Sequence, residues 1–139
     1  MENKIHFKEN GDPINVLIID DNGILLRTAK EMLEEQFEVS IAPSYDVALK
    51  AVKKKKPDII LLDYEMPKMN GIDTLKALRE KKETREIPII FLTGVADKSI
   101  VTEILSLKPD GYMLKPPNKQ KLIDLIEKIL FPEDEIEDD

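Results

Sequence analysis

The sequence predicts a doubly wound α/β domain, in which five helices cover a five-stranded parallel sheet. Two observations predict it. Three short runs are apolar throughout, as strands buried on both faces are: Val16–Ile19, Ile59–Leu62 and Ile89–Leu92. Segments with the apolar period of amphipathic helices lie between these runs. Strands that alternate with helices pair in parallel through right-handed crossovers, so the helices must cover both faces of the sheet.

The remaining elements complete a strict alternation of strand and helix. Weaker strands are predicted at Phe37–Ile41 and Gly111–Leu114. Ser44 and Asn118 stand where helix N-caps belong. The apolar faces of the five helices are, in chain order, Leu25, Ala29, Met32 and Leu33; Val47, Ala48, Ala51 and Val52; Ile72, Leu75 and Leu78; Ile100, Val101, Ile104 and Leu105; and Leu122, Ile123, Leu125, Ile126, Ile129 and Leu130.

The length of 139 residues suits a single domain, which we place at residues 14–130. Residues 1–13 are polar, end in a turn signal, and are interpreted as a short, weakly ordered arm. Residues 131–139 are interpreted as a disordered acidic tail, because six of the nine are acidic and none is basic. The rest of the chain is nearly neutral, although the net charge is −7. This balance argues against direct nucleic-acid binding, and Lys53–Lys56 is interpreted as a solvated helix end.

Composition excludes several kinds of site. The chain has no cysteine, which excludes disulfides, thiol catalysis and thiolate metal sites. Its one histidine, His6, falls in the N-terminal arm, which argues against Ser-His-Asp triads and multi-histidine metal sites. The apolar runs are too short to span a membrane, and the first residues lack an apolar signal region, so we expect a cytoplasmic protein.

Polar side chains follow four of the five predicted strands. Asp20 and Asp21 follow the first strand, Asp63 the third, Thr93 the fourth and Lys115 the fifth. The carboxyl ends of parallel strands lie at one edge of a sheet, and open α/β sheets bind ligands in the crevice outside that edge. We therefore expect three carboxylates, a hydroxyl and an ammonium group to converge there.

Each of these residues also has a simpler interpretation. Asp21 and Thr93 could be N-caps of the helices that follow them, and Lys115 could be an exposed loop lysine. Taken together, they favour a chemical site. Three clustered carboxylates resist joint ionisation, and Mg²⁺ is a cation that such oxygens hold. A carboxylate can also act as a nucleophile toward phosphorus, with a lysine and a hydroxyl beside the phosphate oxygens.

The chain resembles the receiver domain of two-component response regulators, over roughly residues 14–130. The resemblance depends on the pair Asp20-Asp21, the stretch Asp-Tyr-Glu-Met-Pro-Lys-Met-Asn-Gly at 63–71, Thr93-Gly94, and Tyr-Met-Leu-Lys-Pro at 112–116. It implies a flavodoxin-like receiver fold. It also implies a signalling phosphoacceptor, phosphorylated by a histidine kinase or a phosphotransfer protein, that catalyses only its own phosphoryl transfer and autodephosphorylation.

The resemblance assigns a role to each matched position. Asp63 is implied to be the phosphoacceptor, and Mg²⁺ to be held by Asp20, Asp21, Asp63 and the backbone carbonyl of Glu65. Thr93 and Lys115 are implied to contact the phosphoryl group. Two further implied features are a switch formed by Thr93 with Tyr112, and a cis peptide bond before Pro116.

Some positions depart from the common pattern, and other functions stay open. Lys108-Pro109-Asp110 replaces the small residues frequent before the fifth strand, and Pro117 replaces a bulky apolar residue. Both lie beside the surface through which such domains usually contact their targets, formed by the fourth helix, the fifth strand and the fifth helix. The downstream protein target is therefore unknown, and a homodimer is left open. The alternative functions are an aspartate-nucleophile phosphatase and a scaffold that is never phosphorylated.

Overall fold

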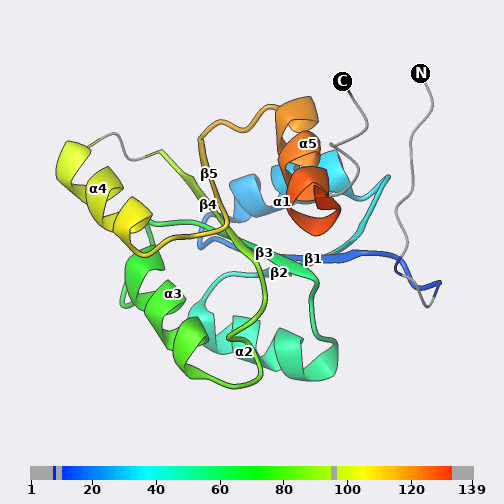
Figure 1. Ribbon diagram of the computed structural model, residues 1–139, viewed down its shortest axis with the longest axis horizontal. Coiled ribbons are helices and arrows are strands. Elements are labelled where there is room, and N and C mark those ends of the chain that lie inside the picture. Colours follow the sequence, from blue (N-terminus) through cyan, green and yellow to red (C-terminus); the bar gives the residue numbers. More distant parts are fainter. Residues whose placement is uncertain (1–7, 9–10, 95–96, 133–139) are drawn as a thin grey trace.

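Five parallel strands form one sheet in the order β2-β1-β3-β4-β5, with five helices around it (Figure 1). This computed structural model describes residues 8, 11–94 and 97–132. The predicted fold and its alternation are confirmed. The elements are β1 (Asn15–Ile19), α1 (Gly23–Leu33), β2 (Glu38–Ala42), α2 (Tyr45–Lys54), β3 (Ile59–Leu62), α3 (Gly71–Glu80), β4 (Ile89–Thr93), α4 (Lys98–Ser106), β5 (Gly111–Leu114) and α5 (Lys119–Leu130).

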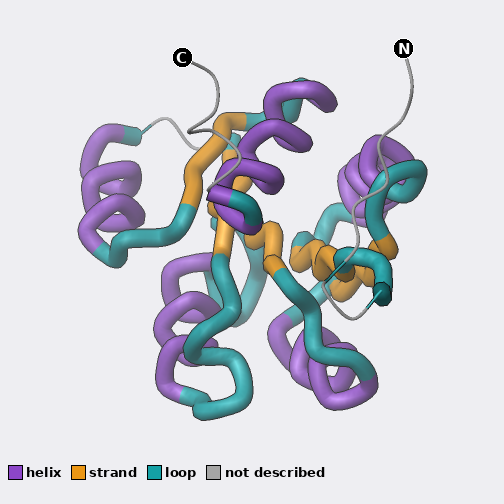
Figure 2. Tube along the Cα trace, turned by 45° about the vertical axis from the view of Figure 1, so that its right-hand side comes forward, coloured by secondary structure: helices purple, strands orange, loops and turns teal. Residues whose placement is uncertain are grey.

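Different helices cover the two faces of the sheet. Helices α2, α3 and α4 pack against one face, and α1 and α5 pack against the other (Figures 1 and 2). Each face has its own apolar core. Every residue of β1, β3 and β4 is buried, as their unbroken apolar sequences predict. The hydrophobic burial on both faces therefore holds these three strands, and the residues that follow them, in place.

Two residues on the predicted apolar helix faces are exposed. Val47 of α2 is 38% exposed and Leu105 of α4 is 51% exposed, so their predicted burial is wrong. In α4, Ile104 alone is buried. Helices α2 and α4 lie toward the two edges of the sheet (Figure 1), where strands β2 and β5 cover less of a helix than central strands do. Periodicity predicts the side of a helix that faces the core, not how far the sheet extends beneath it.

The ends of several elements follow local sequence signals. The side chain of Ser44 caps α2 and that of Asn118 caps α5, as predicted. Helix α2 ends at Lys54, and the whole lysine run is exposed, with Lys55 paired to Glu38. The predicted arm and tail, with His6, lie largely outside the described residues. Among the described residues, each helix is too short or too polar to cross a bilayer.

The strand order reverses at β1, which has β2 on one side and β3 on the other. The chain moves outward from β1 to β2, then returns to place β3 on the other side of β1. The connections after β1 and β3 consequently diverge toward opposite faces of the sheet, with α1 on one face and α3 on the other. Ligands of open α/β sheets bind at such a reversal of strand order.

Candidate functional site

Three carboxylates meet where strand order reverses. Asp20 and Asp21 follow β1, and Asp63 follows the neighbouring strand β3. The Asp20 N–H donates to the Ala42 carbonyl at 3.1 Å, and the Asp63 N–H donates to Ile19 at 2.9 Å. These bonds extend the sheet ladder past the strand ends and fix both backbones. One carboxylate oxygen from each aspartate lies within 4.8 Å of the others.

Lys115 reaches this cluster from the edge strand β5. Its backbone N–H donates to the Thr93 carbonyl at 2.9 Å, and its Nζ lies 2.8 Å from both Asp20 Oδ2 and Asp63 Oδ1. The side chain is only 14% exposed, so the interpretation as an exposed loop lysine is wrong. A buried ammonium between two buried carboxylates offsets part of their mutual repulsion.

Burial sets the electrostatics of the site. Loss of water around Asp63 raises the pKa of its carboxyl from 3.8 to about 6, and Asp20 adds to the rise; Lys115 and the Glu65 N–H act in the opposite direction. For Lys115, burial lowers the pKa, but the contacts with Asp20 and Asp63 outweigh it and the net direction is upward. The lysine therefore carries its charge at neutral pH, and Asp63 ionises near pH 6.

The donor set fits a hard divalent cation. Asp63 is buried, and its Oδ1 pairs with the Lys115 ammonium at 2.8 Å. Asp20 Oδ1 accepts from the Asn22 N–H at 2.9 Å, and Asp21 is exposed beside it. Mg²⁺ is usually bound by one or two carboxylates together with waters and phosphate oxygens. Asp20, Asp21 and Asp63 together offer carboxylate oxygens that could hold such an ion.

The loop after Asp63 is held closed by its own backbone. The N–H groups of Met66 and Gly71 both donate to the Tyr64 carbonyl, at 3.1 and 2.8 Å. Glu65 lies in this loop, and its Oε1 is 4.0 Å from where a Cβ on Gly94 would stand. The loops after β3 and β4 thus approach each other at the site.

The other predicted site residues lie on the two strands beyond β3. Thr93 is the last residue of β4 and is fully buried. Tyr112 is half-buried, stands in register with Phe91, and packs against the core on the α2–α4 face. The Lys115–Pro116 peptide bond is cis.

The interpretation of Asp21 and Thr93 as helix caps is wrong, because Asn22 caps α1 and Asp97 caps α4. Asn22 is a site residue that the sequence reasoning missed. Its backbone N–H orients Asp20 while its side chain accepts from Ile24 and Leu25. The signal was present, since asparagine before an apolar helical run is a favoured N-cap.

The raised pKa of Asp63 predicts a pH-dependent stability in the absence of divalent cations. Between pH 3.8 and about 6 the folded chain binds more protons at Asp63 than the unfolded chain, so stability falls as pH rises through that window. We expect Asp63→Asn to raise the unfolding free energy by about 1–3 kcal/mol near neutral pH, with the gain shrinking as pH approaches 4. Urea unfolding in a chelator measures it.

Asp97→Asn is the matched control. Contacts with Ser99 and Ile100 lower the pKa of this exposed carboxyl, the opposite direction from Asp63. Asparagine also caps helices well, so the fold should be retained. We expect no gain in stability near neutral pH from this variant. An Asp63→Asn protein no more stable than the wild type would contradict the raised pKa.

Known proteins are similar to this chain in sequence and in fold. Residues 16–127 match the response regulator receiver domain family. The transcriptional regulatory protein CpxR of Escherichia coli is 40% identical over 116 residues, covering 83% of this chain and 48% of that protein. A protein-glutamate methylesterase/protein-glutamine glutaminase of Trichodesmium erythraeum is 34% identical over 125 residues, covering 84% of this chain and 35% of that protein. The chain thus spans half or less of these relatives.

Solved structures agree with the sequence matches. The chemotaxis protein CheY4 of Vibrio cholerae has a TM-score of 0.77 at 27% identity, covering 84% of this chain and 98% of that one. A putative response regulator from Chloroflexus aurantiacus has a TM-score of 0.78 at 28% identity, covering 86% and 98%. The sequence match, the parallel sheet and the acidic triad agree. This chain therefore belongs to the response regulator receiver domain family of two-component signalling.

Proposed function

We propose that Asp63 is the phosphoacceptor of this receiver domain. The observation that carries the proposal is the position of the buried Asp63 carboxylate, which lies beside two other carboxylates and has its Oδ1 2.8 Å from the Lys115 ammonium. Its raised pKa still leaves the carboxylate ionised above about pH 6, the form that can attack phosphorus.

The neighbouring residues have complementary roles in this proposal. An Asp63 oxygen forms a bond to phosphorus while the donor's bond to phosphorus breaks, giving an acyl phosphate. Asp20, Asp21, Asp63 and the Glu65 carbonyl would hold Mg²⁺, which supplies positive charge beside the phosphoryl oxygens. Lys115 pairs with Asp63 before transfer and with a phosphoryl oxygen afterwards. The reaction depends mainly on positioning and charge neutralisation.

The Thr93 hydroxyl and the Tyr112 ring form the proposed switch. Phosphorylation adds about 1.5–2 negative charges and new hydrogen-bond acceptors at the end of β3. The Thr93 hydroxyl would donate to one of the phosphoryl oxygens, and the change is passed across β4 to Tyr112, which stands beside Phe91. The adjoining surface of α4, β5 and α5 would then favour a different protein partner.

Receiver domains partner with histidine kinases, and we propose such a kinase or a phosphotransfer protein as the phosphate source. We also propose that residues 14–130 form the functional unit, that the protein acts in the cytoplasm, and that it is not an enzyme for external substrates. Aspartate phosphatases usually carry the nucleophile at the end of the first strand and a second acid two residues later, whereas here Asn22 follows the adjacent Asp20 and Asp21. The downstream target depends on the output surface.

Intact-mass measurement tests the proposal. Incubation with Mg²⁺ and a small phosphodonor should add the mass of one phosphoryl group to the wild-type chain. Asp63→Asn should abolish the adduct, whereas Asp73→Asn should retain it, because Asp73 is an exposed carboxylate in the first turn of α3. A chelator should suppress the adduct in both wild type and Asp73→Asn.

Three outcomes would contradict the proposal. An adduct that persists in Asp63→Asn would place the acceptor elsewhere. Complete absence of an adduct in the folded wild type would favour the scaffold alternative. Rapid turnover of an aryl phosphate by the wild type, lost in Asp63→Asn, would instead favour the phosphatase.

A further inference from the structure

A groove of about 280 Å³ lies between the end of α2 and the loop that follows α3. The two helices lie side by side on the same face of the sheet (Figures 1 and 2). Val52 is buried and Leu49 is half-buried, which gives the groove an apolar base. The phosphoryl chemistry proposed above uses none of the residues that line it, which are Leu49, Val52, Lys53, Lys81, Glu83 and Thr84.

The groove carries an excess of positive charge. Lys53 and Lys81 are exposed, and each is followed by another exposed lysine, Lys54 and Lys82. Among the described residues, none of these four lysines forms an ion pair. Of the six lining residues, only Glu83 is acidic. The groove therefore suits an occupant that combines several carboxylates with an apolar side chain.

A segment with this composition follows α5 in the same chain. Residues 133–139 read Glu-Asp-Glu-Ile-Glu-Asp-Asp, with six acids, no base and Ile136 as the one apolar residue. They lie beyond the described residues, which end at Pro132. We call residues 133–139 the acidic segment.

The position at which α5 ends also favours the groove. The last turn of α5 packs at the start of β5, where a Cβ on Gly111 would lie 3.2 Å from Ile129 Cδ1. The preceding residue, Asp110, accepts a hydrogen bond from Arg79 Nη2 at 3.2 Å, and Arg79 Nη1 donates to the Arg85 carbonyl at 3.2 Å. The end of α5 and the loop after α3 therefore meet at the same edge of the sheet.

The acidic segment is long enough to pass around this edge. Its seven residues extend to about 23–25 Å, which is about the width of two helices. A segment of that length can reach from α5 on one face of the sheet to α2 and α3 on the other.

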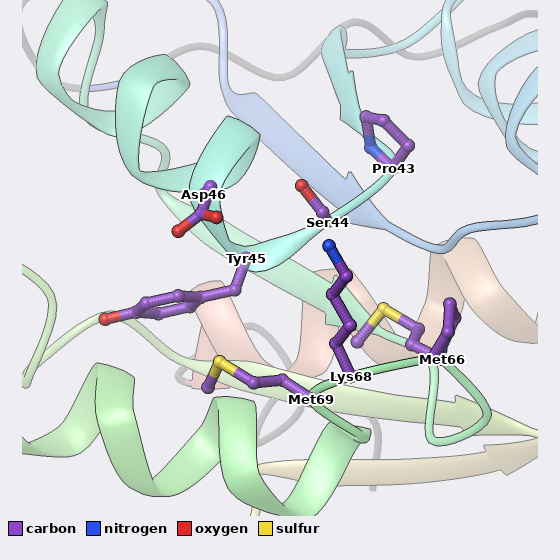
Figure 3. Close-up of a pocket in the computed structure, with 8 residues that line it drawn as sticks. Pro43, Ser44, Tyr45, Asp46, Met66, Lys68 and Met69 are labelled. Atoms are coloured by element: carbon purple, nitrogen blue, oxygen red, sulfur yellow. The ribbon is translucent and has the colours of Figure 1, made fainter.

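The pocket at the opposite end of α2 suits the acidic segment less well. Figure 3 shows this pocket between the start of α2 and the loop that follows Asp63. Both Lys68 and Asp46 line it, so its charges balance. It also lies toward the carboxyl edge of the sheet, whereas α5 ends at the amino edge.

We propose that the acidic segment of this chain docks in the groove between α2 and the loop after α3. Its carboxylates lie beside Lys53 and Lys81, and Ile136 covers Val52. Exposed ion pairs are individually weak, but covalent attachment gives the segment an effective concentration in the millimolar range. The docked segment therefore competes with any acidic partner for this surface.

Paramagnetic relaxation NMR on the full chain tests the proposal. The chain has no cysteine, so Asp139→Cys provides a single attachment site for a nitroxide label. We expect the label to broaden the amide signals of Leu49, Lys53 and Thr84 at about 0.05 M NaCl. The broadening should disappear at about 0.5 M NaCl, because salt screens exposed charges. Broadening spread evenly over the surface around α5, or unaffected by salt, would overturn the proposal.

A matched pair of double variants tests the role of the groove lysines. Lys53→Gln with Lys81→Gln should lower the docking equilibrium constant by about fivefold to tenfold. Lys119→Gln with Lys121→Gln removes the same charge from exposed positions at the start of α5, and should leave docking unchanged. Equal losses in the two double variants would show attraction to net charge alone and would overturn the proposal.

Two single variants test the fit of the segment to the groove. Glu83→Gln should strengthen docking by about twofold, because it removes the acidic side chain from the lining. Ile136→Ser leaves the charge unchanged and should weaken docking by about threefold, because less apolar surface is buried. Docking that responds to neither variant would place the acidic segment outside the groove.

A mixed sample distinguishes this chain's own segment from that of a second copy. Isotope-labelled chain without nitroxide is combined with unlabelled chain that carries it. We expect no broadening at Lys53 or Thr84 in the mixture, and broadening there would assign the occupant to a second copy and overturn the proposal. Docking requires no phosphoryl transfer, so this proposal and the assignment of Asp63 can each fail alone.

Discussion

Replacing Gly71 with alanine is expected to lower the unfolding free energy by about 2–3 kcal/mol and to slow phosphoryl-adduct formation. A Cβ at Gly71 would stand 2.5 Å from the Asp63 carbonyl oxygen, 2.7 Å from the Tyr64 Cα and 2.7 Å from Phe91 Cε1. Two of these neighbours are backbone atoms, and Phe91 is fully buried. The start of α3 would have to move away from Asp63.

Gly23→Ala is the matched control for this prediction. Both glycines are the first residue of a helix, and neither has a positive φ. A Cβ at Gly23 has no neighbour within 4 Å. Alanine there should be neutral or stabilise by about 0.4–1 kcal/mol through the unfolded chain. Urea unfolding measures the stability of both variants. Equal stability would show that the start of α3 can move away from Asp63 at no cost, which would contradict the prediction.

Lys115→Met is expected to slow phosphorylation of the chain by about 100-fold. Lys115 Nζ lies 2.8 Å from Asp20 Oδ2 and from Asp63 Oδ1. Without it, two buried carboxylates face each other with less compensation, so the pKa of Asp63 rises further. More of the acceptor is then protonated near neutral pH, and a positive donor for the phosphoryl oxygens is lost. The rate is measured by intact mass against time.

Lys119→Met controls for loss of a lysine in the same region of the chain. Lys119 lies 3.4 Å from Glu35, and both side chains are about half exposed. Exposed ion pairs of this kind contribute little. We expect the rate for Lys119→Met to match the wild type. A Lys115→Met protein that phosphorylates as fast as this control would remove Lys115 from the reaction.

The fold could be predicted because its determinants are local. Val16–Ile19, Ile59–Leu62 and Ile89–Leu92 are apolar on both faces, and the strands found there are buried on both. Ser44 and Asn118 cap helices through bonds to residues three positions ahead. The burial of the helices near the sheet edges was less predictable, as the exposed Val47 and Leu105 illustrate.

The sequence predicts which residues form the site but not how their side chains are arranged. The rule that parallel strands end at one edge predicts that Asp20, Asp63 and Lys115 meet. It does not predict that one ammonium lies 2.8 Å from both carboxylates, or that the Lys115 side chain is only 14% exposed. Those facts depend on how far the side chain of Lys115 reaches across β4. The role of Gly71 is similar, because the start of α3 approaches Asp63 and Phe91 only when α3 packs against the sheet.

By itself, the sequence determined the order of strands and helices along the chain, the Ser44 and Asn118 caps, and the set of acidic, hydroxyl and basic residues at one edge of the sheet. Apolar period and capping are properties of neighbours along the chain, so they can be recognised without coordinates. The tertiary structure alone decided the contact between Lys115 and Asp20, 95 residues apart, the burial of Asp63 and the pocket beside it. These depend on strand register and packing across the core, which join residues that no local pattern relates.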